Sequence, residues 1–182
     1  MEPTGPLVRP PVMHTEQATD SLADARPAEA PQDHRAAFAA FYSTHYVRAV
    51  RVAMLLVDSR AVAEELAQDT FVEVLQAWGR IDEPAAYLRV SLVNRCRSWG
   101  RRRRLEKRQR VDDRVGPDQD TALVIRAALR RLSSRQRAAI VLRYYEDLTE
   151  ADTARVLGCR PGTAKSLVSR GLAAMKEYLD AD

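Results

Sequence analysis

The chain has 182 residues, 46% of them hydrophobic and 30% charged, with a formal net charge of +4 at pH 7. That length allows one domain or two small ones. No apolar run approaches the roughly 18 residues of a membrane span, and the N-terminus lacks the pattern of a secretory signal. We therefore expect no membrane insertion and a cytoplasmic protein.

The residues that usually carry catalysis or bind metals are sparse. Cys96 and Cys159 are far apart in the sequence, and His14, His34 and His45 form no compact set of metal ligands. The sequence also lacks a Gly-rich phosphate loop and a G-x-S-x-G elbow. We expect reduced cysteines, no metal, no cofactor and no enzymatic activity.

Residues 1–34 differ in composition from the rest of the chain. They hold six of the nine prolines and six acidic residues against two arginines, a local net charge of −4. Such a segment cannot bury enough apolar surface to offset the entropy lost on ordering. We predict a disordered, acidic, Pro/Ala-rich tail.

Residues 35–110 carry apolar side chains at helical spacing. The pattern predicts two long amphipathic helices, with apolar positions at Phe38, Phe41, Tyr42, Tyr46 and Val50 and then at Val62, Leu66, Val74, Leu75 and Trp78. Pro84 suits the first turn of a third helix. That helix has an apolar face at Leu88, Leu92, Cys96 and Trp99. We predict a first helical domain over 35–110.

A linker and a second helical domain follow. Residues 111–120 (VDDRVGPDQD) have a Gly-Pro pair and no apolar period, which is typical of a linker. In residues 121–182, Ser133 begins an S-x-x-Q capping box. No strand pattern of useful length is present. We therefore predict an all-α protein made of two small helical domains joined by a flexible linker.

The third helix is strongly basic. Residues 89–114 contain eleven basic and three acidic residues, a local net charge of +8. One face repeats polar and basic side chains at steps of three and four, at Asn94, Arg97, Arg101, Arg104 and Arg108. Like charges at this spacing weaken an isolated helix, so the pattern favours a polyanion as partner, nucleic acid first. A solvated face with excess arginine is the alternative.

Leu148 to Met175 resembles a helix-turn-helix. Thr149 caps a short helix that ends at Gly158, and Pro161 opens a second helix. The inward positions are expected to be Ala164, Val168, Leu172 and Met175, and the outward positions that contact DNA to be Thr163, Lys165, Ser166, Ser169 and Arg170. An ordinary helical hairpin is the alternative interpretation.

Taken together, these motifs resemble the extracytoplasmic-function sigma factors of bacterial RNA polymerase, in particular the actinobacterial SigE-like type. The second-region signature is similar to AEELAQDTFVEVL from Ala63 to Leu75, and the melting region to PAAYLRVSLVN from Pro84 to Asn94. The fourth region resembles LSSRQR from Leu132 and PGTAKSLVSR from Pro161.

The resemblance implies core RNA polymerase and promoter DNA as partners, and it leaves room for an anti-sigma factor. The implied polymerase-binding residues are Glu65, Leu66, Gln68 and Asp69, and those for the minus-ten element and melting are Tyr87, Asn94, Arg97, Arg101 and Arg104. The helix from Pro161 would read the minus-thirty-five element, with Arg160 placed to touch a phosphate. Leu167 stands where many members have Arg, and we expect it to face outward and change the base preference.

Two rival functions belong to other classes of protein. An autonomous helix-turn-helix regulator would bind operators without polymerase, but it would not require the acidic and apolar pattern of the second region. An RNA-binding or nucleic-acid-processing enzyme would use the arginine helix as a substrate track. The sequence shows no convergent set of catalytic groups for that enzyme.

Overall fold

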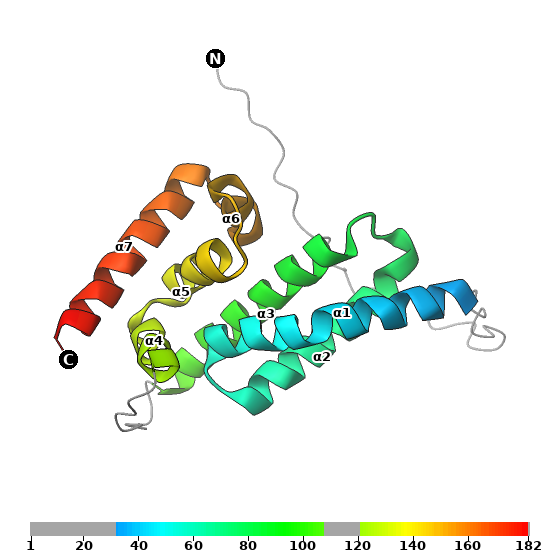
Figure 1. The fold of residues 1–182 in the computed structure, drawn as a ribbon, viewed down its shortest axis with the longest axis horizontal. Helices are drawn as coiled ribbons and strands as arrows, with labels where there is room; N and C mark the ends of the chain where they lie inside the picture. The colour runs from blue at the N-terminus through cyan, green and yellow to red at the C-terminus, as the bar shows by residue number, and fades with distance from the viewer. Residues whose placement is uncertain (1–31, 108–120, 182) are drawn as a thin grey trace, which may run out of the picture. The chain divides into compact units, whose positions relative to one another are not determined.

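The computed structural model describes residues 32–107 and 121–181, and every regular element within these ranges is helical (Figure 1). The predicted linker, 111–120, lies outside the described residues, as does the predicted tail up to residue 31. The all-α class is confirmed for the part of the chain that the structure describes.

Three long helices form the N-terminal module, which we define as residues 32–107. Its elements are α1 (Gln32–Val57), α2 (Arg60–Ala77), the 3-10 turn η1 (Trp78–Arg80) and α3 (Pro84–Lys107). The predicted apolar face of α3 is confirmed, because Leu88, Leu92 and Cys96 are buried against α1 and α2. Phe71 of α2 lies in the same core, with its ring 4.8 Å from that of Tyr42.

The C-terminal module, residues 121–181, is a set of shorter helices. It contains α4 (Thr121–Arg131), α5 (Ser134–Ile140), the π-helical turn η2 (Val141–Tyr145), α6 (Glu150–Leu157) and α7 (Pro161–Asp180). The capping box is confirmed, since Ser133 Oγ accepts from the backbone N–H of Gln136 and the Gln136 side chain accepts from the backbone N–H of Ser133. The sequence did not predict η2.

The two modules share apolar contacts. Val93 of α3 is fully buried in a cluster with Leu142 of η2 and Leu157 of α6. In Figure 1, α5 lies between α3 and α7, and both pairs of helices are in contact. The described residues therefore form one compact unit.

Candidate functional site

The exposed side of α2 carries the first candidate surface. Glu65, Gln68 and Asp69 are all exposed, as a partner-binding face requires. Leu66 is not part of that face: it is only 7% exposed and lies in the core of the N-terminal module. The expectation that Leu66 itself touches a partner is corrected, because its side chain points toward the core.

Two apolar residues extend the same surface. Val72 is 53% exposed and Leu75 is 50% exposed, and they follow Gln68 at helical steps of four and three. Sequence analysis placed Leu75 in the apolar stripe of its helix and did not single out Val72. Exposed apolar residues beside polar ones are typical of a protein-binding patch. We call the exposed set Glu65, Gln68, Asp69, Val72 and Leu75 the α2 face.

Glu73 joins α2 to α3. Its carboxylate accepts hydrogen bonds from the hydroxyls of Tyr87 (2.8 Å) and Ser91 (3.3 Å) and from Nη2 of Arg95 (2.9 Å). Burial alone would raise the pKa of Glu73, but the hydrogen bonds from Tyr87 and Arg95 outweigh it and the pKa lies below its usual value. The Arg95 guanidinium also lies 3.5 Å from Asp69, so α3 positions an acidic residue of the α2 face.

The predicted DNA-contacting residues of α3 differ in how exposed they are. Asn94 and Arg101 are exposed, seven residues apart and so nearly in line along the helix. Tyr87, in line with them seven residues earlier, is partly buried with its hydroxyl held by Glu73. The side chain of Arg104 lies outside the described residues.

Arg97 points toward the C-terminal module instead of solvent. Its Nη1 lies 3.5 Å from the carbonyl oxygen of Leu157, and its Nε is buried with no hydrogen-bond partner among the residues that the structure describes. Burial lowers the pKa of Arg97, and the nearby positive charges of Arg135 and Arg101 lower it further. In this conformation Arg97 is not available to DNA in the way that Asn94 is.

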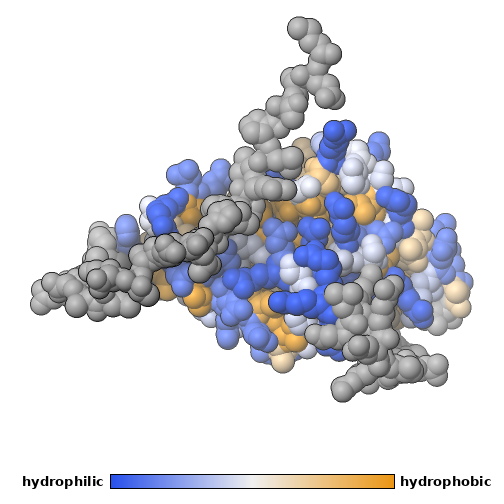
Figure 2. All heavy atoms as spheres, turned by 180° about the vertical axis from the view of Figure 1, so that it is seen from behind, coloured by the Kyte–Doolittle hydropathy of each residue, from blue (hydrophilic) through white to orange (hydrophobic). Residues whose placement is uncertain are grey.

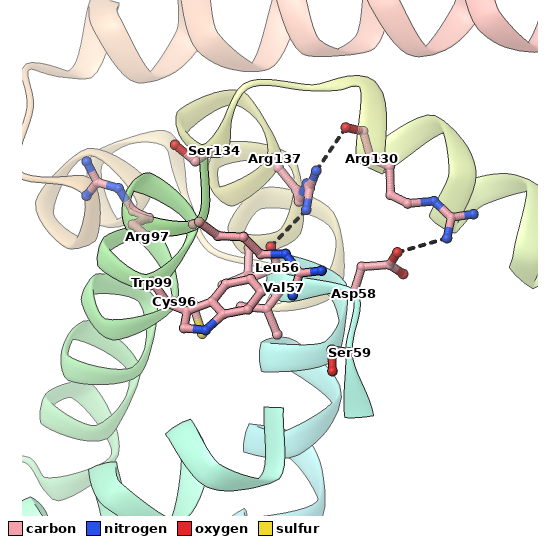
Figure 3. Close-up of a pocket in the computed structure, with 12 residues that line it drawn as sticks. Leu56, Val57, Asp58, Ser59, Cys96, Arg97, Trp99, Arg130, Ser134 and Arg137 are labelled. Atoms are coloured by element: carbon pink, nitrogen blue, oxygen red, sulfur yellow. Dashed lines mark hydrogen bonds and ion pairs between the residues drawn. The ribbon is translucent and has the colours of Figure 1, made fainter. Parts of the chain in front are cut away.

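A basic pocket of about 300 Å³ lies between α1, α3 and the α4–α5 junction (Figure 3). Four arginines line it, namely Arg97, Arg103, Arg130 and Arg137, and its single acid is Asp58. Arg103 stacks on the indole of Trp99 at 5.1 Å. The Asp58 carboxylate is paired with Arg130 at 2.8 Å and with Arg126 at 3.1 Å.

The helix-turn-helix is built as the sequence predicts. Thr149 caps α6 by accepting from the backbone N–H of Asp152, and the helix ends at Gly158 with φ 60°. Pro161 occupies the first turn of α7, while Arg160 before it makes no side-chain cap and is exposed. The side chain of Arg160 is therefore accessible from solvent beside the N-terminus of α7.

The outward face of α7 agrees with the predicted residues except at one position. Thr163, Lys165, Ser166, Ser169 and Arg170 are all exposed, and the last four line a shallow hollow. The expectation for Leu167 is wrong, because its side chain is 8% exposed and packs in the core shared with α5 and α6.

The inward face of α7 also needs a correction. Leu172, which was expected to be inward, is 41% exposed, and Gly171 is buried beside Ile140 instead. The prediction for Ala164 is confirmed, since that residue is fully buried. Val168 and Met175 are partly buried against the core clusters, as expected, so the predicted inward face is wrong at Leu172 alone and also includes Leu167 and Gly171.

Within 32–107 and 121–181, no three His, Cys, Asp or Glu side chains are placed to hold a metal ion. Burial raises the pKa of the Cys96 thiol to about 12, so it stays protonated and unreactive at neutral pH. In the same part of the chain, no helix is both long and apolar enough to cross a membrane.

Comparison with known protein families gives two ordered matches. Residues 41–106 match sigma-70 region 2, and residues 122–175 match sigma-70 region 4. The RNA polymerase sigma-E factor of Streptomyces avermitilis is 32% identical over 154 residues, covering 79% of this chain and 86% of that protein. The ECF RNA polymerase sigma factor SigM of Mycobacterium tuberculosis is also 32% identical, over 80% of this chain and 78% of that protein.

Solved structures show the same arrangement of helices. The sigma factor RpoE of Bartonella quintana, crystallised with the anti-sigma factor NepR, aligns with TM-score 0.67 and 27% identity over 80% of this chain and 98% of that chain. CnrH in complex with the cytosolic domain of CnrY aligns with TM-score 0.62 over 81% of this chain and 90% of that chain. The identity to CnrH is 23%, so that likeness concerns the fold.

Proposed function

The chain belongs to the extracytoplasmic-function sigma factors of the sigma-70 family, and from that premise we propose how its surfaces direct transcription initiation. The α2 face binds core RNA polymerase, α3 binds and opens the minus-ten element, and α7 reads the minus-thirty-five element. The two ordered family matches carry this proposal, because region 2 and region 4 each coincide with one helical module. An operator-binding regulator would have no use for region 2.

The division of labour follows from the chemistry of each surface. The α2 face combines carboxylate, amide and apolar groups, which suit a protein partner better than a polyanion. The exposed cations of α3 and α7, by contrast, suit phosphates. Phosphodiester formation belongs to the polymerase, so the chain itself catalyses nothing and acts in the cytoplasm where the polymerase is. The NepR complex of the Bartonella relative supports a regulatory anti-sigma partner here too.

The domain boundaries and the remaining site residues belong to the same proposal. Residues 35–110 form the region 2 domain, 121–182 the region 4 domain, and 111–120 link them. Minus-ten binding and melting are assigned to Tyr87, Asn94, Arg101 and Arg104, and to Arg97 in a conformation that frees its guanidinium from the carbonyl oxygen of Leu157. Minus-thirty-five binding is assigned to Arg160, Thr163, Lys165, Ser166, Ser169 and Arg170.

Reconstitution with core polymerase tests this function. The purified chain should co-elute with core RNA polymerase and give transcripts that depend on a promoter. Asp69→Arg reverses one charge of the α2 face. It should weaken the affinity for core polymerase at least about tenfold, because the new arginine would repel the positive charge on the polymerase that is expected to meet Asp69. The matched control is Glu64→Gln, on the same helix, where the carboxylate pairs with its neighbour Arg60. Equal binding by the parent, Asp69→Arg and Glu64→Gln would remove the assignment of the α2 face.

A further inference from the structure

The proposed function assigns no ligand to the basic pocket between α1, α3 and the α4–α5 junction (Figure 3). Its volume of about 300 Å³ is at the lower end of the range of small-molecule sites. On α3 the residues that line it recur at helical steps of three and four, at Cys96, Trp99, Gly100 and Arg103. One face of α3 thus forms a continuous wall of the pocket.

Gly100 keeps this wall open. A Cβ added at this position would meet no heavy atom within 4 Å. No neighbouring atom therefore requires a glycine here, although glycine weakens a helix by about 1 kcal/mol relative to alanine. Because glycine carries no side chain, a ligand in the pocket is able to approach the backbone of α3 closely.

The single carboxylate that lines the pocket is already bound to cations. The two oxygens of Asp58 accept from Arg126 at 3.1 Å and from Arg130 at 2.8 Å, so one negative charge serves two guanidinium groups. Nearby, Nη1 of Arg137 donates to the carbonyl oxygen of Leu56 at 2.9 Å, at the negative end of α1. The groups here that would repel an anion are thus neutralised by arginines.

Two arginines of α3 bring further positive charge to the pocket. Arg103 is exposed and lies over the indole of Trp99 at 5.1 Å, and among the described residues no carboxylate pairs with it. Arg97 lies at the other end of the pocket from Asp58 (Figure 3), and its buried Nε has no hydrogen-bond partner in the described part of the chain. Phosphate is an acceptor that the planar fork of a guanidinium fits well.

The pocket also offers apolar and planar surfaces. Leu56 and Val57 line it, and the guanidinium stacked on Trp99 is able to stack on a second ring with its other face. A ligand with a planar ring and phosphate groups matches both features. We propose that the basic pocket binds a nucleoside diphosphate, with the base on Arg103 and the phosphates toward Arg97. This site does not depend on the sigma-factor function.

Calorimetric titration of the full-length free protein with adenosine diphosphate (ADP) tests the site. Arg103→Gln removes the stacking guanidinium and its charge, and should weaken binding at least about tenfold. Gly100→Leu keeps every charge but places a side chain in the pocket, and should weaken binding as much. The matched control is Arg102→Gln, which removes the same charge from an exposed neighbour outside the pocket. It should change the affinity less than about twofold, because solvent screens an exposed charge.

Other ligands identify which part of the nucleotide is recognised. Adenosine lacks the phosphates and inorganic pyrophosphate lacks the base, so each should bind at least about tenfold more weakly than ADP. Equal binding of pyrophosphate and ADP would make this a simple anion site, and equal binding of adenosine and ADP would remove the role of the arginines. A single-stranded oligonucleotide that binds more tightly than ADP and is weakened by Gly100→Leu would assign the pocket to nucleic acid. Each of these three results would overturn the proposal.

Thermal unfolding gives a second measurement and checks that the variants fold. ADP should raise the melting temperature of the parent and of Arg102→Gln, but not of Arg103→Gln or Gly100→Leu. A folded parent that shows neither heat of binding nor a higher melting temperature at millimolar ADP would overturn the site. Equal weakening by Arg102→Gln and Arg103→Gln would reduce it to general attraction by a basic helix. Co-elution with core polymerase is scored separately, so failure of the sigma-factor function is seen apart from failure of this site.

Discussion

The hydroxyl of Tyr87 on α3 donates a 2.8 Å hydrogen bond to Oε1 of Glu73 on α2. Ser91 and Arg95, one and two turns further along α3, donate to the same carboxylate. One acidic residue thus fixes the register of two helices that carry different proposed surfaces. It also holds the ring of Tyr87 against the core, where burial and the bond to Glu73 raise the pKa of the phenol.

Replacing this carboxylate should loosen the N-terminal module. We expect Glu73→Gln to lower the free energy of unfolding by about 1 kcal/mol, because the group that accepts from Arg95 and Tyr87 loses its negative charge at a partly exposed site. Urea denaturation followed by circular dichroism measures this. Glu65→Gln, an exposed change on the same helix, should leave the midpoint unchanged. Equal midpoints for both variants would mean that Glu73 does not stabilise the contact.

The same residue predicts a pH dependence. The pKa of Glu73 is lower in the folded protein than in the unfolded chain, so the unfolded chain binds the proton more readily. The stabilisation is therefore complete above the unfolded pKa and is lost as the pH falls through the folded one. Below about pH 4.5, the parent should lose stability more steeply than Glu73→Gln. Parallel curves for the two proteins over that range would contradict this.

Two glycines in helices should respond in opposite directions to alanine. At Gly171 a new Cβ would lie 3.1 Å from Cγ1 of buried Ile140, whereas at Gly100 nothing lies within 4 Å. Alanine favours a helix by about 1 kcal/mol over glycine, but overpacking costs about 1–3 kcal/mol. We expect Gly100→Ala to raise the melting temperature and Gly171→Ala to lower it. A higher melting temperature for both variants would show that the Ile140 side chain moves aside for the new methyl group at little cost in stability.

Local sequence signals predicted the elements well because they act within one turn. The Ser133 capping box and the ends of α6 at Thr149 and Gly158 depend on residues three or four apart. The burial of Leu167 depends on distant neighbours instead. α7 packs against both α5 and α6, so its buried arc includes Gly171, a residue that carries no apolar signal.

The contacts between modules could not be predicted in the same way. Glu146 meets Arg48 from 98 positions away, and nothing in the local pattern distinguishes it from other surface acids. Arg97 shares a helical face with Asn94 in the sequence, yet the C-terminal module covers it. Helical periodicity gives the direction of a side chain but not what lies opposite it.

The different burial of Leu167 and Leu172 on α7 predicts unequal losses of stability when each is replaced by alanine. Leu167→Ala should destabilise the C-terminal module by about 2–4 kcal/mol, since it leaves a cavity in the core. Leu172→Ala should cost less than about 1 kcal/mol, because Leu172 is 41% exposed. Thermal unfolding of the two variants makes the comparison. Similar losses at both positions would contradict the difference in burial between Leu167 and Leu172.

The last prediction separates DNA opening from phosphate attraction. Arg101 is exposed on α3 and Lys165 on α7, so either cation is able to contact DNA. If α3 holds melted strands, Arg101→Ala should reduce open-complex formation on duplex promoters about tenfold, with a smaller loss on a template that already contains a bubble. Lys165→Ala should weaken binding to both templates equally. It should also reduce the number of counterions released on binding, measured from the salt dependence, by about one. Permanganate footprinting of holoenzyme complexes measures opening on each template. Equal loss on duplex and bubble for Arg101→Ala would assign this residue to phosphate attraction alone.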